Sequence, residues 1–187
     1  GEWASGRCVR RERVAATTAI PTGSGDRQIQ YIEHNDIVAL AAEQRIGASP
    51  AVEDVIAGIA DYDGDSRPEI ALVKTPHIGG ELQIWRFAGS GLKRLAAAQG
   101  FSNHFIGSRA LSLSATLDAN GDGRADLAVP SADRTKLLVM TLQGGSLNEL
   151  RSIDLAAPVS GNITRAGGTK LSVPVKGGRR IVDAAGP

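Results

Sequence analysis

The sequence predicts an all-β protein of the β-propeller class, built from four-stranded blades. Two observations lead to this prediction. An acidic motif centred on glycine occurs twice, at Asp61–Glu69 and Asp118–Asp126, and each copy runs into a short apolar stretch. A longer repeat contains these motifs, because residues 83–99 align with residues 28–44 after a shift of 55 residues. A fixed period of this size indicates stacked supersecondary units.

The acidic motifs place oxygen-bearing side chains at loop positions 1, 3, 5 and 9. These are Asp61, Asp63, Asp65 and Glu69 in the first motif, and Asp118, Asn120, Asp122 and Asp126 in the second. Calcium takes about six to eight oxygen ligands, and a tight loop with alternating carboxylates supplies several of them. Gly64 and Gly121 stand where such a loop must turn sharply. We therefore expect two calcium ions, one per loop; the alternative is a pair of acidic turns that bind nothing.

The EF-hand is the competing calcium motif, and the sequence argues against it. An EF-hand loop ends in a bidentate Glu at its twelfth position and lies between two helices. Here the twelfth position is Leu72 in one motif and Val129 in the other, and the residues that follow are strand-like.

Each complete repeat is expected to form four short strands separated by turn residues. The expected strands are 54–60, 69–74, 81–87 and 92–98 in one unit, and 110–117, 126–130, 136–142 and 147–154 in the next. The Ala-rich run Leu92–Gln99 resembles a helix, but it is short and aligns with residues 147–154. We therefore assign it to an outer strand.

Partial units flank the two complete ones. Residues 14–20, 26–32 and 36–44 fit the last three strands of a blade, and residues 159–164, 169–175 and 179–184 fit the first three strands of another. In the latter, Arg165–Gly168 replaces the acidic loop, so no calcium is expected there. The chain then divides into an arm (1–13), an incomplete blade (14–49), two calcium-loop blades (50–105 and 106–157) and a second incomplete blade (158–187).

The pattern Asp-x-Asp-Gly-Asp-x-x-x-(Asp/Glu)-(Leu/Ile), between the first two strands of each unit, resembles the FG-GAP or VCBS repeat. These repeats build the seven-bladed propellers of integrin α-subunits and of many secreted bacterial proteins, and the resemblance covers about residues 50–155. It implies a bacterial partial chain with about three and a half blades, half of a seven-bladed propeller. It also implies that the side chains at positions 1, 3, 5 and 9 bind calcium together with the Arg67 and Arg124 carbonyls. Glu69 departs from the commoner Asp at position 9.

A propeller of three and a half blades has two open edges, which invite pairing with another chain. We expect another polypeptide, either one that completes the propeller or a partner subunit. A first residue that is Gly rather than Met fits a cleavage product or one part of a larger assembly. The alternative is a compact partial propeller whose end strands pair with each other.

Composition narrows the functional classes. The net charge is +1, from 21 basic and 20 acidic residues, which argues against nucleic-acid binding. The cluster Arg7, Arg10, Arg11 and Arg13 is typical of a solvated arm, and Cys8 has no second cysteine to pair with inside the chain. No apolar run approaches the roughly 20 residues of a membrane span. Calcium loops work best where calcium is plentiful, so we expect an extracytoplasmic protein, periplasmic or secreted.

A second candidate site lies on loops expected opposite the calcium loops. Residues 75–80 and 99–109 carry His77, Asn103, His104 and Arg109 as a possible ligand face. A hydrolase or lyase using this face is the alternative function, but no nucleophile–base pair with an orienting third group is legible. We favour side chains that satisfy their own loops, and a calcium-binding interaction or scaffolding module over an enzyme.

Overall fold

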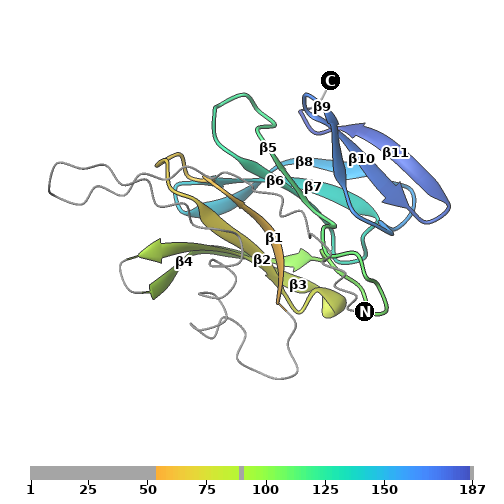
Figure 1. Cartoon of the computed structure of the whole chain (residues 1–187), viewed down its shortest axis with the longest axis horizontal. Helices are drawn as coiled ribbons and strands as arrows, with labels where there is room; N and C mark the ends of the chain where they lie inside the picture. Colours follow the sequence, from red (N-terminus) through yellow and green to blue (C-terminus); the bar gives the residue numbers. More distant parts are fainter. Residues whose placement is uncertain (1–53, 89–90, 186–187) are drawn as a thin grey trace, which may run out of the picture. The chain divides into compact units, whose positions relative to one another are not determined.

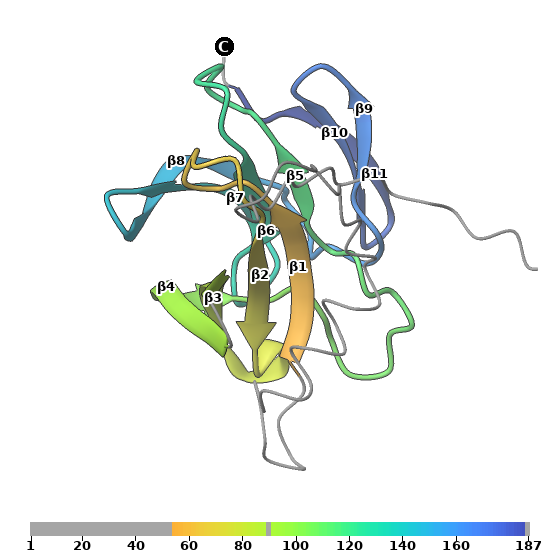
Figure 2. The same cartoon turned by 60° about the vertical axis from the view of Figure 1, so that its left-hand side comes forward.

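The computed structural model describes residues 54–88 and 91–185, and its strands in this part of the chain form three antiparallel sheets (Figure 1). The first sheet contains β1 (Asp54–Ala60), β2 (Glu69–Lys74), β3 (Gly80–Ala88) and β4 (Gly91–Phe101), in that order. The second contains β5 (Ala115–Leu117), β6 (Asp126–Pro130), β7 (Lys136–Gln143) and β8 (Ser146–Asp154). The third contains β9 (Thr164–Gly167), β10 (Lys170–Val175) and β11 (Gly178–Asp183), with β10 in the middle (Figure 2).

The all-β prediction is confirmed for the described residues, and so are most of the strands. The bounds of β1, β2 and β6 are those that the sequence predicts, and residues 92–98 lie in β4 rather than in a helix. The predicted arm, the incomplete blade at 14–49 and Cys8 lie outside the described residues. The division into blades, and their number, remain predictions.

The first two sheets are built to one plan, as the repeat predicts. Phe87 pairs with Leu92 in the first, and Leu142 pairs with Leu147 in the second. Each outer hairpin also has an irregularity at the same place, between Ile84 and Trp85 and between Val139 and Met140. The connection between the second and third strands has five residues in both sheets, 75–79 and 131–135, and in the first sheet it carries the short 3-10 helix η1 (Pro76–Ile78).

The expected strand at 110–117 is shorter in the structure, where β5 begins only at Ala115. The register that pairs Ala115 with Ala128 would bring Leu113 opposite Pro130. Proline has no N–H to donate, so the ladder ends there. The residues before β5 bond to other neighbours instead: the Ile163 N–H donates to the Ser112 carbonyl and the Ser114 hydroxyl donates to the Ala57 carbonyl.

The third sheet corrects a second expectation. Residues 165–168 were expected to form a turn, but β9 runs from Thr164 to Gly167. Gly167 pairs with Lys170, so the hairpin turns over two residues only, and the positive φ of Gly168 (53°) permits this tight turn. The expected strand at 159–164 is reduced to a single bridge between Val159 and Val175.

Two clusters of buried side chains hold the sheets together, and the second sheet contributes to both. Leu127 and Val129 of β6 pack with residues of the first sheet, including Val73 and Leu82. Ala128, on the opposite face of β6, packs with residues of the third sheet such as Leu171. Burial on both faces explains why β6 is apolar at consecutive positions instead of alternating.

In the part of the chain that the structure describes, no helix has the length and apolar character of a membrane span.

Gly80, the first residue of β3, offers a test of this packing. A Cβ there would lie 2.7 Å from the Lys74 carbonyl oxygen and 2.9 Å from that of Phe101. Since backbone atoms cannot move aside cheaply, we expect Gly80→Ala to lower the free energy of unfolding by about 1–3 kcal/mol in urea titrations. Gly178→Ala is the control, because a Cβ at Gly178 meets nothing within 4 Å. Equal stability of the two variants would contradict this packing.

Candidate metal centre

Two acidic loops connect the first and second strands of the first two sheets. We call residues 61–69 the first acidic loop and residues 118–126 the second. In each, the carboxylate at position one accepts two backbone N–H groups. Asp61 accepts from Gly64 at 2.7 Å and from Ser66 at 2.8 Å. Asp118 accepts from Gly121 at 2.7 Å and from Gly123 at 2.9 Å, so the two loops fold around this carboxylate in the same way.

The loops differ where the backbone turns for the second time. Gly64 and Gly121 both have positive φ, 83° and 76°, as the motif predicts. At the sixth position the second loop has Gly123 with φ 83°, whereas the first loop has Ser66 with φ 67°. A side chain resists this conformation, so the first loop is the more strained of the two.

The next positions repeat the same pattern of bonds. The oxygens of Asp63 and Asn120 accept the N–H groups of Asp65 at 3.2 Å and of Asp122 at 3.0 Å. The arginine at position seven then pairs with the acid at position five. Arg67 lies 2.6 Å from Asp65, and Arg124 lies 2.5 Å from Asp122. The hydrogen bonds from Arg124 lower the pKa of Asp122 to about 2, and those from Arg67 lower the pKa of Asp65.

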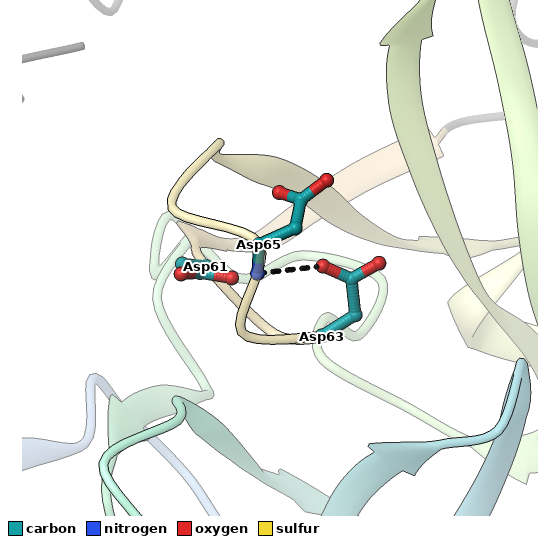
Figure 3. Close-up of side chains that lie close together, drawn as sticks. All are labelled: Asp61, Asp63 and Asp65. Carbon is teal, nitrogen blue, oxygen red and sulfur yellow. Dashed lines mark hydrogen bonds between the residues drawn. The ribbon is translucent and has the colours of Figure 1, made fainter.

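Figure 3 shows Asp61, Asp63 and Asp65 around one turn of the first loop. One oxygen from each carboxylate lies within 4.8 Å of the others, so this cluster could hold a metal ion. All three residues were predicted as ligands from the sequence.

The carboxylate at position nine is buried in both loops. Glu69 and Asp126 begin β2 and β6, and both side chains are fully buried. Each accepts the N–H of the residue at position two, Tyr62 at 2.8 Å and Ala119 at 2.9 Å. Burial raises the pKa of both carboxyl groups. These contacts fasten each loop to the start of a core strand.

The second oxygen of this carboxylate has different surroundings in the two sheets. Glu69 Oε1 accepts from Arg86 Nε and Nη2, both at 3.0 Å. Asp126 Oδ1 is buried and accepts no hydrogen bond from any described residue. The Thr141 hydroxyl is near enough to lower the pKa of Asp126, but it too makes no hydrogen bond within the described residues. An unpaired carboxylate oxygen of this kind is costly unless a cation or a donor reaches it.

Arg86 and Thr141 occupy equivalent positions on the third strands of the first two sheets. Arg86 pairs with Glu69 across the β2–β3 hairpin, and the register of β6 with β7 places Thr141 opposite Asp126. From this place the Arg86 guanidinium also hydrogen-bonds Asp63 and lies 3.1 Å from Asp65. It therefore contacts three of the four side chains predicted to bind calcium in the first loop.

Sequence analysis missed Arg86. Its pairing partner is revealed only by the hairpin register, since Glu69 and Arg86 are 17 residues apart whereas Asp126 and Thr141 are 15 apart. The available signal was the shift of 55 residues, which aligns Arg86 with Thr141.

The two loops also touch each other. The Ala125 N–H donates to the Asp61 carbonyl at 3.0 Å. A Cβ on Gly64 would lie 2.8 Å from Arg124 Cδ, so the Arg124 side chain covers this glycine. Nearby, the hydroxyls of Tyr62 and Thr116 are 3.1 Å apart.

The donor sets fit a hard cation such as calcium unequally. The second loop offers the buried Asp126 Oδ1, which accepts no hydrogen bond from a described residue. The first loop offers the denser carboxylate cluster, but Arg86 already pairs with most of it.

The structure brings two of the four residues of the possible ligand face together. The rings of His77 and His104 are 5.2 Å apart, edge to face. His104 Nδ1 lies 3.0 Å from the Ala110 carbonyl, and Asn103 donates to the Val55 carbonyl at 2.8 Å. Arg109 is exposed. The bonds of Asn103 and His104 to backbone carbonyls support a structural role for this pair.

The comparison with protein families agrees with the loops. The model of the FG-GAP-like repeat matches residues 61–129, from the first acidic loop into β6. This segment of the chain is therefore similar to the FG-GAP-like repeat, and the resemblance seen in the sequence is confirmed over it. No curated protein matches the chain.

The strain at the sixth position gives a prediction for the loops themselves. We expect Gly123→Ser to lower the free energy of unfolding by about 1 kcal/mol, because serine resists a positive φ. Ser66→Gly is expected to act in the opposite direction, since it relieves the same strain in the first loop. Urea titrations measure both, with Gly178→Ser as the control at a glycine of ordinary φ. Changes of the same sign for Gly123→Ser and Ser66→Gly would contradict the equivalence of the two loops.

Proposed function

We propose that the chain is part of a calcium-stabilised, β-propeller-like module that binds other proteins. The match to the FG-GAP-like repeat and the blade-like order of the first two sheets support a propeller. The single observation that carries the calcium proposal is Asp126 Oδ1, at position nine of the second acidic loop, which is buried and has no hydrogen-bond partner among the described residues.

The candidate calcium ligands of an acidic loop are the side chains at positions 1, 3, 5 and 9 and the carbonyl at position 7. In the second loop these are Asp118, Asn120, Asp122, Asp126 and the Arg124 carbonyl; in the first they are Asp61, Asp63, Asp65, Glu69 and the Arg67 carbonyl. The ion supplies positive charge to carboxylates that otherwise repel one another. Its role is structural, since it fixes the turn that begins each second strand.

An extracytoplasmic location, periplasmic or secreted, follows from the same chemistry. Loops that depend on calcium for their order are useful where calcium is abundant, and extracellular modules work with weak sites.

Calcium removal tests the metal proposal. We expect saturating calcium to raise the melting temperature above that in excess chelator by roughly 5–10 °C, the shift for a ligand at about a hundredfold its Kd. Differential scanning calorimetry measures it, and magnesium at equal concentration is the control for ionic strength. The proposal is wrong if the melting curve with chelator and the curve with calcium coincide.

The partner is proposed from the third sheet. β11 pairs only with β10 among the described strands, and Ile181 on β11 is 60% exposed. An edge strand with free N–H and C=O groups readily accepts another strand. We propose that a strand from another polypeptide covers this edge, as part of a completed propeller or as a partner subunit.

Sedimentation tests this proposal. We expect the isolated chain to self-associate, or to co-purify with another chain, because β11 pairs on one side only among the described strands and exposes Ile181. Ile181→Lys should reduce the association, since a charged side chain on an edge strand disfavours pairing. A cooperatively melting monomer of 19.4 kDa without a partner would mean that the chain closes its own edges.

A further inference from the structure

We propose that Arg86 is a built-in cation that takes the place of the metal in the first acidic loop. The first loop is then ordered without calcium, and only the second loop requires the ion. This inference rests on the proposed calcium function, because it says which of the two loops carries that function.

The contacts of Arg86 support this assignment. Its guanidinium bonds to Asp63 and Glu69 and forms an ion pair with Asp65, so it engages three of the four acidic side chains of the loop. A guanidinium presents five N–H donors in one plane, enough to satisfy several carboxylate oxygens at once. Calcium would need these same oxygens. Arg86 and the ion therefore compete for one site.

Arg86 is also held firmly in this place. It lies on β3, directly opposite Glu69 in the hairpin register, and its side chain is only 17% exposed. Glu69 is fully buried, so displacing Arg86 would leave that carboxylate without its counter-charge. Loss of one partner from a buried pair is strongly destabilising.

The two units differ together at two equivalent positions. Asp63 and Arg86 of the first unit correspond to Asn120 and Thr141 of the second. The first loop thus gains one acid and one base, and these two residues contact each other. The charges of the added acid and the added base cancel, so the formal net charge of the two sites is the same. The added positive charge, however, lies among the carboxylate oxygens of the first loop. An added acid in contact with an added base is what we expect where an arginine takes the place of a metal ion.

The second loop has no arginine at the position equivalent to Arg86. Thr141 is short and neutral, and Asp126 Oδ1 accepts no hydrogen bond from a described residue. A cation that enters this loop gains a buried oxygen ligand that no described side chain hydrogen-bonds, and the arginine it meets is Arg124, which pairs with Asp122 alone of the proposed ligands. Calcium should therefore bind the second loop in preference to the first.

Calorimetric titration with calcium measures the number of sites. We expect one ion per wild-type chain. Arg86→Thr, which copies the second unit, is expected to bind two. Arg94→Thr removes an equal charge from exposed β4 of the same sheet and should still bind one. Transfer of the pair to the second loop, with Asn120→Asp and Thr141→Arg together, should abolish binding.

Two conservative variants in the wild-type background test the inference even if Arg86→Thr does not fold. We expect Asp122→Asn to weaken calcium binding by roughly tenfold or more, because it removes a charged ligand from the occupied loop. Asp65→Asn should weaken calcium binding much less than Asp122→Asn does, since Arg86 serves that loop. Glu149→Gln, on exposed β8 outside both loops, is the control that should leave the affinity and the single site unchanged.

The possible outcomes separate this inference from the calcium proposal. Two equal sites in the wild-type chain, or one site that Asp65→Asn weakens as much as Asp122→Asn does, would overturn the role of Arg86 and leave calcium binding intact. No heat of binding in the wild-type chain, with one site gained in Arg86→Thr, would support Arg86 and overturn calcium binding by the second loop. No binding in any variant would overturn both.

Discussion

The acidic loops depend on a carboxylate that is buried at the first residue of a core strand. Glu69 and Asp126 are fully buried, and each accepts the N–H of the second residue of its own loop. This one contact joins the loop to the sheet, because the same residue starts the second strand and closes the turn. Burial of a carboxylate without compensation is costly, so each sheet requires either a positive charge or a strong donor at this point. The identity of that compensating group is what distinguishes the two repeats.

The first sheet compensates within the chain, through Arg86 on the neighbouring strand. The second sheet leaves one oxygen of Asp126 without a described partner. A repeat fold makes this comparison direct, because the two sheets share their strand order, the register of their outer hairpins and the position of an irregularity in them. The pairing of residues across a hairpin, rather than the loop motif alone, decides how the loop is balanced. Identical ligand spacing in two loops therefore does not imply identical chemistry.

Much of the fold was accessible from the sequence, since the motif fixes where the second strand of each sheet begins and the turn residues mark its limits. The start of β5 was not, because the ladder ends at a proline on the opposite strand, Pro130, whose effect depends on register. The turn expected at Arg165–Gly168 became strand because two glycines allow a tighter hairpin. The loop residues that we expect to bind calcium could be listed from their spacing, whereas Arg86 could not be predicted, since it reaches the first loop from β3. Long-range contacts of this kind are set by packing and not by local pattern.

The two acidic loops also contact each other, and these contacts restrict the conformation of both. Arg124 pairs with Asp122 in its own loop and packs over Gly64 in the other, while the Ala125 N–H binds the Asp61 carbonyl. The backbone of the second loop is thereby bonded to the residue that organises the first, since Asp61 accepts two of its N–H groups. The first loop, with its carboxylates paired to Arg86, therefore contacts the second through a backbone hydrogen bond and a packed side chain. Under the calcium proposal, an ion in the second loop would bind beside a neighbour that is already ordered, and this order lowers the entropy cost of binding.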